Sequence, residues 1–97
     1  DVYPNPFVVD NYNFINGDGH VRFIYSGQDI SSSIDIFDFS MDLVSSIKNP
    51  TLINDQIEFI WNGRNTYNQV VKNGVYFCRL NYSGYHKWVK LAVIKGG

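Results

Sequence analysis

Short runs in which apolar and polar residues alternate recur along most of the chain. Successive side chains of a β-strand point to opposite faces, so a period of two predicts strands with one buried face. Residues typical of turns separate these runs, as in a sheet protein built from short strands. The predicted strands are Phe7–Val9, Val21–Tyr25, Ser33–Phe37, Asp42–Ile47, Gln56–Trp61, Val75–Tyr82 and Tyr85–Ile94.

The same alternation assigns the two faces of each predicted strand. Tyr76, Cys78 and Leu80 share one face, which we expect to point inward. Phe77, Arg79 and Asn81 are expected to point outward. The predicted core is completed by the inward positions of the other strands, which are Val21, Phe23, Tyr25, Ile34, Ile36, Ile57, Phe59, Trp61, Leu91 and Val93.

The connections between the strands contain residues that tolerate unusual backbone angles. Asn16-Gly17-Asp18-Gly19 and Asn73-Gly74 accept positive φ, and Ser83-Gly84 predicts a tight hairpin turn. Residues 62–73 are predicted to form a long loop.

The composition supports strands over helices. Ten valines, ten isoleucines, seven tyrosines and seven phenylalanines stand against one alanine and four leucines. β-Branched and aromatic side chains fit a pleated, half-buried surface. The predicted fold class is therefore an all-β, immunoglobulin-like (Ig-like) antiparallel sandwich of about seven strands.

Length and charge limit the possible functions. The 97 residues suffice for one domain, predicted over residues 1–95, with Gly96-Gly97 as a terminal tail or linker. The chain starts with Asp1 instead of methionine, which favours a piece of a longer protein. Eight basic and nine acidic residues give a net charge of -1 without a basic cluster, which argues against nucleic acid. No apolar run approaches the roughly 18 residues of a membrane span, so no membrane insertion is expected.

Five motifs, in order and spacing, resemble those of a known family. The chain is similar to the bacterial Ig-like C-terminal modules grouped as FlgD-like (flagellar hook capping) domains and type IX secretion sorting domains. Phe7 and the weakly basic last strand look closer to the FlgD-like branch. The motifs are Tyr3-Pro4-Asn5-Pro6-Phe7, Ile36-Phe37-Asp38, Trp61-Asn62-Gly63-Arg64-Asn65, Asn73-Gly74-Val75-Tyr76-Phe77, and Lys90-Leu91 with Lys95.

Two positions depart from the family pattern. The family usually has a glycine in the hairpin after Asp38, where this chain has Phe39-Ser40-Met41-Asp42, and another near Asn68. Asparagine can occupy the left-handed region, so Asn68 is a mild change, while the hairpin is expected to use a different turn.

The motif residues also have structural explanations. Pro4 and Pro6 fix φ and stiffen the first strand. Trp61 is large enough to fill the space between two sheets, and Gly63 follows it in a sharp turn. The turn at Gly74 directs Tyr76 toward the core.

Residues that could carry catalysis or hold a metal do not form a convincing set. His20 and His86 each lie beside a turn, and Cys78 has the parity of a core residue, where its pKa is expected to rise. Asp35 and Asp38 have opposite parity, and Glu58 has no obvious partner. A calcium loop from Asp10, Asn16 and Asp18 is less favoured than a plain polar hairpin. We therefore expect no enzyme activity, no cofactor, and no catalytic or metal site.

Exposed aromatic and basic residues are the candidates for contact with a partner. Trp88, Tyr82 and Tyr85 flank one hairpin, where they can form stabilising cross-strand pairs or a platform for carbohydrate. Cross-strand pairing is the favoured interpretation of these three rings, ahead of a carbohydrate platform. The first and last strands could pair with another chain by strand addition, with Lys90 and Lys95 guarding the last edge.

The resemblance implies a non-catalytic C-terminal module of a larger bacterial protein, secreted or placed on the cell surface through the periplasm. It implies a role in export and sorting, surface attachment, or docking to secretion or envelope machinery or to the parent protein's other domains. Two alternatives stay open: a polysaccharide-binding accessory module of a secreted hydrolase, and a flagellar hook capping-type scaffold domain.

Overall fold

The computed structural model describes residues 2–3, 5–9 and 19–95, and all the regular structure in them is β-strand. Within these residues no helix is long and apolar enough to cross a membrane. The strands are β1 (Val2–Tyr3), β2 (Phe7–Val9), β3 (Val21–Ser26), β4 (Ser33–Phe37), β5 (Leu43–Ile47), β6 (Thr51–Ile53), β7 (Gln56–Trp61), β8 (Gly74–Tyr82) and β9 (Tyr85–Lys95).

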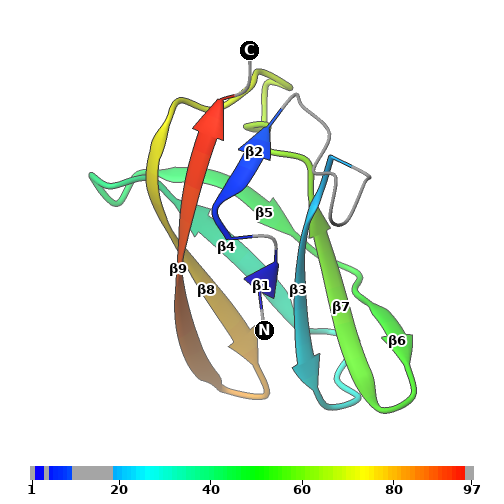
Figure 1. Ribbon diagram of the computed structural model, residues 1–97. Coiled ribbons are helices and arrows are strands. Elements are labelled where there is room, and N and C mark those ends of the chain that lie inside the picture. The colour runs from blue at the N-terminus through cyan, green and yellow to red at the C-terminus, as the bar shows by residue number, and fades with distance from the viewer. Residues whose placement is uncertain (1, 4, 10–18, 96–97) are drawn as a thin grey trace.

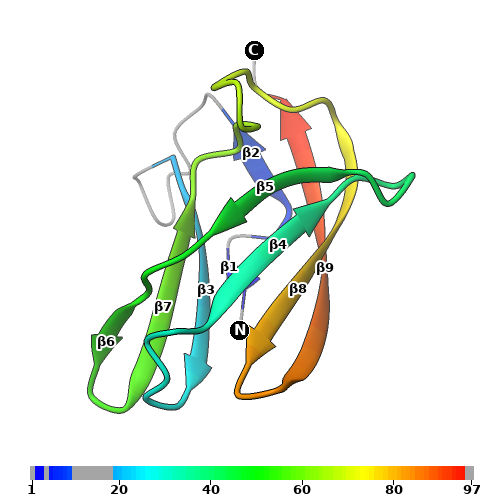
Figure 2. The same ribbon diagram turned by 180° about the vertical axis from the view of Figure 1, so that it is seen from behind.

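Two sheets pack face to face as a sandwich (Figure 1; Figure 2). One sheet has four strands in the order β1-β3-β7-β6, and the other has five in the order β2-β9-β8-β4-β5. This is the Ig-like arrangement. β1, β3, β7 and β6 take the places of Ig strands A, B, E and D, and β9, β8 and β4 take those of G, F and C. The predicted all-β sandwich is confirmed.

The core between the sheets consists of the residues that the alternation assigned to it. Phe23, Ile36 and Cys78 are fully buried, and every other predicted core residue is buried as well. Phe7 from β2 and Val71 from the loop before β8 are also part of the core. Period-two alternation therefore located both inner faces correctly.

The β8–β9 hairpin is the longest pairing in the molecule, and its two-residue turn sets its register. Ser83 and Gly84 have φ values of 43° and 85°, as a type I′ turn requires. Asp29 accepts hydrogen bonds from the Ser83 backbone N–H (3.2 Å) and hydroxyl (3.0 Å). Hydrogen bonds from Ser31 lower the pKa of the Asp29 carboxyl most, and those from Ser83 lower it further. The predicted hairpin is confirmed.

The described residues contain nine strands where about seven were expected. The additional strands are β1 and β6, which are two and three residues long. Neither is long enough to show a clear alternation, and all three residues of β6 are exposed. Asn54 and Asp55, both with positive φ, form the tight turn from β6 to β7.

The prediction that the last strand forms a sheet edge is wrong for residues 93–95, which pair with β2; the ladder with β2 does not extend to the first part of β9. β9 lies between β8 and β2, and β2 runs parallel to it with Phe7 opposite Val93. Such a pairing joins segments at opposite ends of the chain, and no local pattern reveals it. At Lys90 the backbone carbonyl is already occupied by a hydrogen bond from Asn5. The side chain of Lys95 lies outside the described residues.

The expected turns at the two departures from the family pattern are present. Met41 has a φ of 66° in the turn between β4 and β5, and Asn68 has a φ of 63°. Both residues occupy the left-handed region that glycine adopts most easily. Asp38 supports the first turn because its Oδ1 accepts hydrogen bonds from the backbone N–H groups of Ser40 and Asp42, each 2.9 Å long.

Candidate functional site

Trp61 fills the space between the sheets, as predicted. It is 3% exposed, and its ring centroid lies 6.4 Å from that of Phe7 and 6.0 Å from that of Tyr76, both in the opposite sheet. The indole Nε1 donates a 2.9 Å hydrogen bond to the carbonyl oxygen of Arg64. Gly63 has a φ of 78°, and the backbone turns there so that the Arg64 carbonyl reaches the indole.

Tyr76 and Leu91 are also structural. The Tyr76 hydroxyl donates a 2.7 Å hydrogen bond to the carbonyl oxygen of Lys72, and burial raises the pKa of this tyrosine, with a further contribution from the charge of Asp38. Leu91 is fully buried, and Gly74 begins β8. These motif residues hold strands and loops together and present no reactive group to solvent.

Asn5 attaches the first segment of the chain to the last strand. Its Nδ2 donates to the carbonyl oxygen of Lys90 (3.0 Å), and its Oδ1 accepts from the backbone N–H of Ala92 (3.1 Å). The side-chain amide thus continues the pairing that β2 makes with β9. Tyr3 lies in β1 and is exposed, and Pro6 follows Asn5 in a cis peptide bond. Pro4 lies outside the described residues.

We expect Asn5→Ala to lower the free energy of unfolding by about 1–2 kcal/mol, because it removes two hydrogen bonds of roughly average strength. Urea unfolding followed by circular dichroism measures the change. Asn62→Ala is the control, since among the described residues the Asn62 side chain bonds within its own loop, accepting from Arg64 N. An Asn5→Ala midpoint equal to that of the wild type would contradict the role assigned to this residue.

The residues considered for catalysis do not converge. Burial raises the pKa of the Cys78 thiol to about 12, as expected for a core cysteine. His86 Nδ1 lies 2.8 Å from Asn81 Oδ1, and Glu58 has a partner after all, in Arg22 at 3.1 Å. In the described part of the chain no group of three or more His, Cys, Asp or Glu residues could hold a metal. Asp10, Asn16 and Asp18, considered for calcium, lie outside that part.

The three hairpin aromatics do not share a surface. The rings of Tyr82 and Tyr85 pair at 5.5 Å on the inward side of the β8–β9 hairpin. Trp88 pairs across the hairpin with Arg79, and therefore lies on the outer side. The pairing interpretation is confirmed for the two tyrosines, and a platform made of all three rings is wrong. Strand parity contained this information, since Tyr82 has the parity of Leu80.

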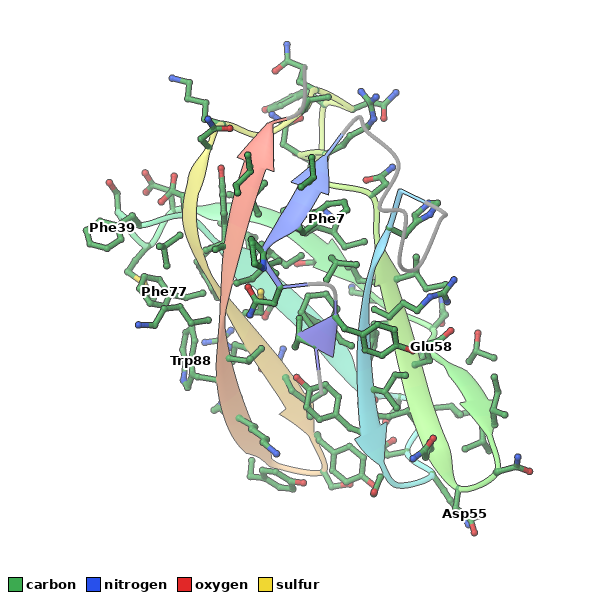
Figure 3. All side chains as sticks on the ribbon, in the orientation of Figure 1. Phe7, Phe39, Asp55, Glu58, Phe77 and Trp88 are labelled. Atoms are coloured by element: carbon green, nitrogen blue, oxygen red, sulfur yellow. The ribbon has the colours of Figure 1, made fainter. Side chains whose placement is uncertain are left out.

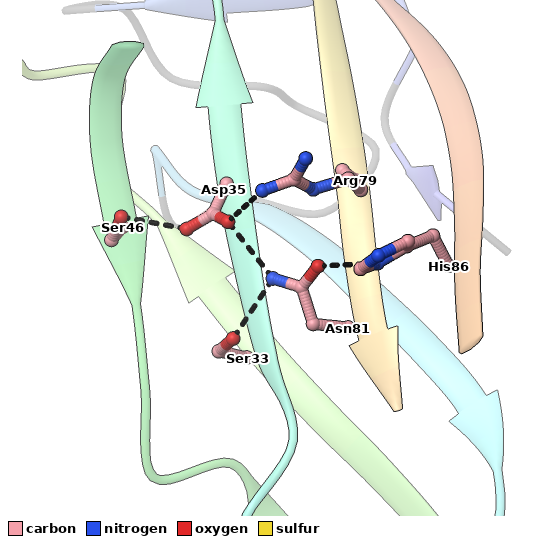
Figure 4. Close-up of polar contacts among 6 residues, drawn as sticks. All are labelled: Ser33, Asp35, Ser46, Arg79, Asn81 and His86. Atoms are coloured by element: carbon pink, nitrogen blue, oxygen red, sulfur yellow. Dashed lines mark hydrogen bonds and ion pairs between the residues drawn. The ribbon is translucent and has the colours of Figure 1, made fainter. Parts of the chain in front are cut away.

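The outer face of the five-stranded sheet carries a polar network that the sequence analysis did not assemble (Figure 4). Asp35 on β4 receives hydrogen bonds from Arg79 (2.9 Å) and Asn81 (2.9 Å) on β8 and from Ser46 (2.7 Å) on β5. Asn81 also donates to the Ser33 hydroxyl (3.1 Å). These side chains converge because the ladders place Asp35 opposite both Arg79 and Ser46.

The network determines the ionisation of Asp35. Partial burial would raise the pKa of its carboxyl, but the hydrogen bonds from Ser46, Asn81 and Arg79 and the charge of Arg79 outweigh burial, so the pKa is lowered. Because the pKa is lower in the folded state, the network stabilises the fold above the unfolded-state pKa of about 4, and the stabilisation is lost as the pH falls through the folded-state value.

We expect Asp35→Asn to reduce the free energy of unfolding at pH 7 by about 1–2 kcal/mol, because the Arg79 guanidinium loses its carboxylate. The difference from the wild type should be constant above about pH 5 and should shrink at lower pH, where the wild-type carboxyl is also protonated. Urea unfolding from pH 3 to pH 8 measures it. A difference that grows on acidification would contradict the assignment.

An open groove of about 550 Å³ lies between the β4–β5 turn and the loop before β8. The rings of Phe39 and Tyr67, 75% and 82% exposed, contribute to its lining. Polar groups of the lining form hydrogen bonds within the loop itself. Asn65 Oδ1 accepts hydrogen bonds from the backbone N–H groups of Tyr67 (2.9 Å) and Gln69 (3.0 Å). Asp38 and Lys72 also line the groove, and Asp38 Oδ1 is bonded to the backbone N–H groups of Ser40 and Asp42.

Comparisons with known proteins show a similarity to a solved structure. No family model matches the chain, and no curated protein matches it. Among solved structures, the chain is similar to PorZ of Porphyromonas gingivalis, described as an essential bacterial surface component of the type IX secretion system. The two share 25% sequence identity with a TM-score of 0.66, and the match covers 97% of this chain but 11% of the PorZ chain. The likeness supports a type IX secretion-related fold, while membership of the FlgD-like group stays a prediction.

Proposed function

We propose that this chain is a non-catalytic module of a larger bacterial protein, secreted or placed on the cell surface, and that it serves export by the type IX secretion system. The observation that carries the proposal is the match to PorZ, which covers almost the whole chain and about a tenth of that surface protein. A module of this size within a longer surface protein suits sorting or docking.

The positions of the motif residues suggest how such a module is recognised. Trp61, Tyr76 and Leu91 are buried, and Asn5 is bonded to the backbone of β9. These buried side chains are not available as an exposed signal, while Asn62, Asn73 and Lys90 of the same motifs are exposed. We therefore propose that the secretion or envelope machinery recognises the folded sandwich, with the motifs acting through its stability. We also propose that the module is related to FlgD-like domains, that it has no enzyme activity and that it uses no cofactor.

A fusion experiment tests the export role. Residues 1–97 are attached to the C-terminus of a periplasmic reporter in a bacterium with a working type IX system and in the same strain without it. We expect the reporter on the cell surface or in the medium only in the competent strain. Trp61→Ala should abolish export by unfolding the module, while Tyr85→Ala, which alters an exposed ring, should leave export intact. A wild-type fusion that is folded but stays in the periplasm would defeat the proposal.

A further inference from the structure

A row of aromatic side chains crosses the outer face of the five-stranded sheet. The aromatic row consists of Phe39, Phe77, Phe37 and Trp88. Phe39 lies 6.0 Å from Phe77, and Phe37 lies 5.7 Å from Trp88, measured between ring centroids. Phe37 and Phe77 are directly opposite each other on β4 and β8, so the two pairs are neighbours on this face. Figure 3 shows Phe39, Phe77 and Trp88 in succession along this side of the molecule.

The exposed rings of the row are held by neighbouring side chains. Phe37 and Trp88 come from strands on either side of β8, about 10 Å apart at the usual strand spacing, so at least one of the two side chains leans over β8 to bring the rings to 5.7 Å. The Arg79 guanidinium lies over both rings, 5.2 Å from the Phe37 centroid and 5.6 Å from the Trp88 centroid. Trp88 is thereby fixed while 48% of its surface remains exposed. A ring held in this way loses little freedom on binding a ligand.

Hydrogen-bonding groups border the row on the side away from Phe39. Asn81 and His86 are opposite each other across the β8–β9 hairpin, one position beyond Arg79 and Trp88 on the same face. Asp35 orients the Asn81 amide, and Asn81 Oδ1 in turn faces His86 Nδ1. Fixed rings beside a few oriented polar groups are the usual composition of a small-molecule site.

The charges on this face favour a neutral ligand. Arg79 is paired with Asp35 at 2.9 Å, so the centre of the face has little net charge. Lys90, opposite Phe77, is the cation beside the row that has no ion-pair partner among the described residues. A nucleic acid or a strongly acidic polymer would require several clustered cations.

We propose that the aromatic row binds a neutral polysaccharide. The C–H faces of successive sugar rings would stack on Trp88 and Phe77, and sugar hydroxyls would exchange hydrogen bonds with Asn81 and His86. Alternation of apolar faces and hydroxyls along a sugar chain matches a surface on which exposed rings lie beside Asn81 and His86. This binding is separate from the proposed export role. Glycan binding depends on particular exposed side chains of the aromatic row, whereas export depends on the module being folded.

Affinity electrophoresis in gels containing hydroxyethylcellulose, xylan or galactomannan tests the proposal, with polygalacturonate as the acidic comparison. We expect retardation by at least one neutral polymer and at least a tenfold loss of affinity in Trp88→Ala. Tyr85→Ala is the matched control, since Tyr85 is also an exposed hairpin ring (54%) but on the opposite face, and it should bind within about twofold of the wild type.

A second measurement needs no variant. The chain has two tryptophans, and Trp61 is buried, so iodide quenching of fluorescence reports mainly on Trp88. The retarding polysaccharide should reduce this quenching. The proposal is overturned if no neutral polymer retards the protein, if polygalacturonate alone does, if quenching is unchanged by the retarding polymer, or if Tyr85→Ala loses as much affinity as Trp88→Ala. A Trp88-dependent dimer without glycan binding would also overturn it, in favour of a second copy on this face.

Discussion

Trp61→Ala is expected to lower the free energy of unfolding by about 3–5 kcal/mol, the usual cost of removing a large buried aromatic ring. The change would leave a cavity between Phe7 and Tyr76, and it would free the Arg64 carbonyl that now accepts the indole hydrogen bond. A domain of this size has a total stability of about 5–15 kcal/mol, so the variant should be marginal at room temperature. Urea unfolding followed by circular dichroism measures the difference.

Two further variants separate packing from other effects of losing an indole. Trp61→Phe keeps an aromatic ring but loses the hydrogen bond to Arg64, so its loss should be clearly smaller than that of alanine. Trp88→Ala removes an exposed indole and should cost about 1 kcal/mol or less. Equal destabilisation by Trp61→Ala and Trp88→Ala would show that Trp61 does not hold the two sheets together.

The Cys78 thiol is expected to react with a disulfide reagent at pH 8 at least about a thousandfold more slowly in the native protein than in urea. The thiolate is the reactive form, and burial raises the pKa of this thiol from 9.0 to about 12. That shift alone lowers the thiolate fraction at pH 8 by about a thousandfold. Cys78 is also fully buried in β8, so the reagent reaches it only when the fold opens. Absorbance of the released thiolate measures the rate.

The rate in Trp61→Ala provides the control. If labelling requires opening, this variant should react faster in proportion to its loss of stability, by roughly two to three and a half powers of ten, because 1.4 kcal/mol corresponds to a factor of ten. Asn5→Ala should accelerate the reaction much less. Fast labelling of the stable wild-type protein would contradict the core position of Cys78.

Alternation was sufficient to predict the main strands and both inner faces. Phe23, Ile36 and Phe59 follow directly from period two, because one face of each strand is buried and the other meets water. β6 escaped prediction because Leu52 and Ile53 are apolar yet exposed at a sheet edge. The parallel pairing of β2 with β9 escaped because it depends on contacts between the two ends of the chain.

The candidate surface was predicted in part. Parity placed Arg79 and Asn81 outward, but it could not show that Asp35 on β4 and Ser46 on β5 meet them, since that depends on strand order. The exposed position of Phe39 is set by the turn after β4, where Met41 adopts a left-handed conformation without a glycine to indicate it. Strand order and turn geometry therefore created the aromatic row, and neither follows from the periodicity of the sequence.

The parallel contact between β2 and β9 has a mechanical consequence. Figure 1 shows both arrows pointing the same way, so a pull that separates the two ends of the chain acts along these strands in opposite directions. The hydrogen bonds that align Phe7, Val8 and Val9 with Val93, Ile94 and Lys95 would then be sheared together instead of being opened one after another. Tension applied through its ends would therefore load this pair as a clamp.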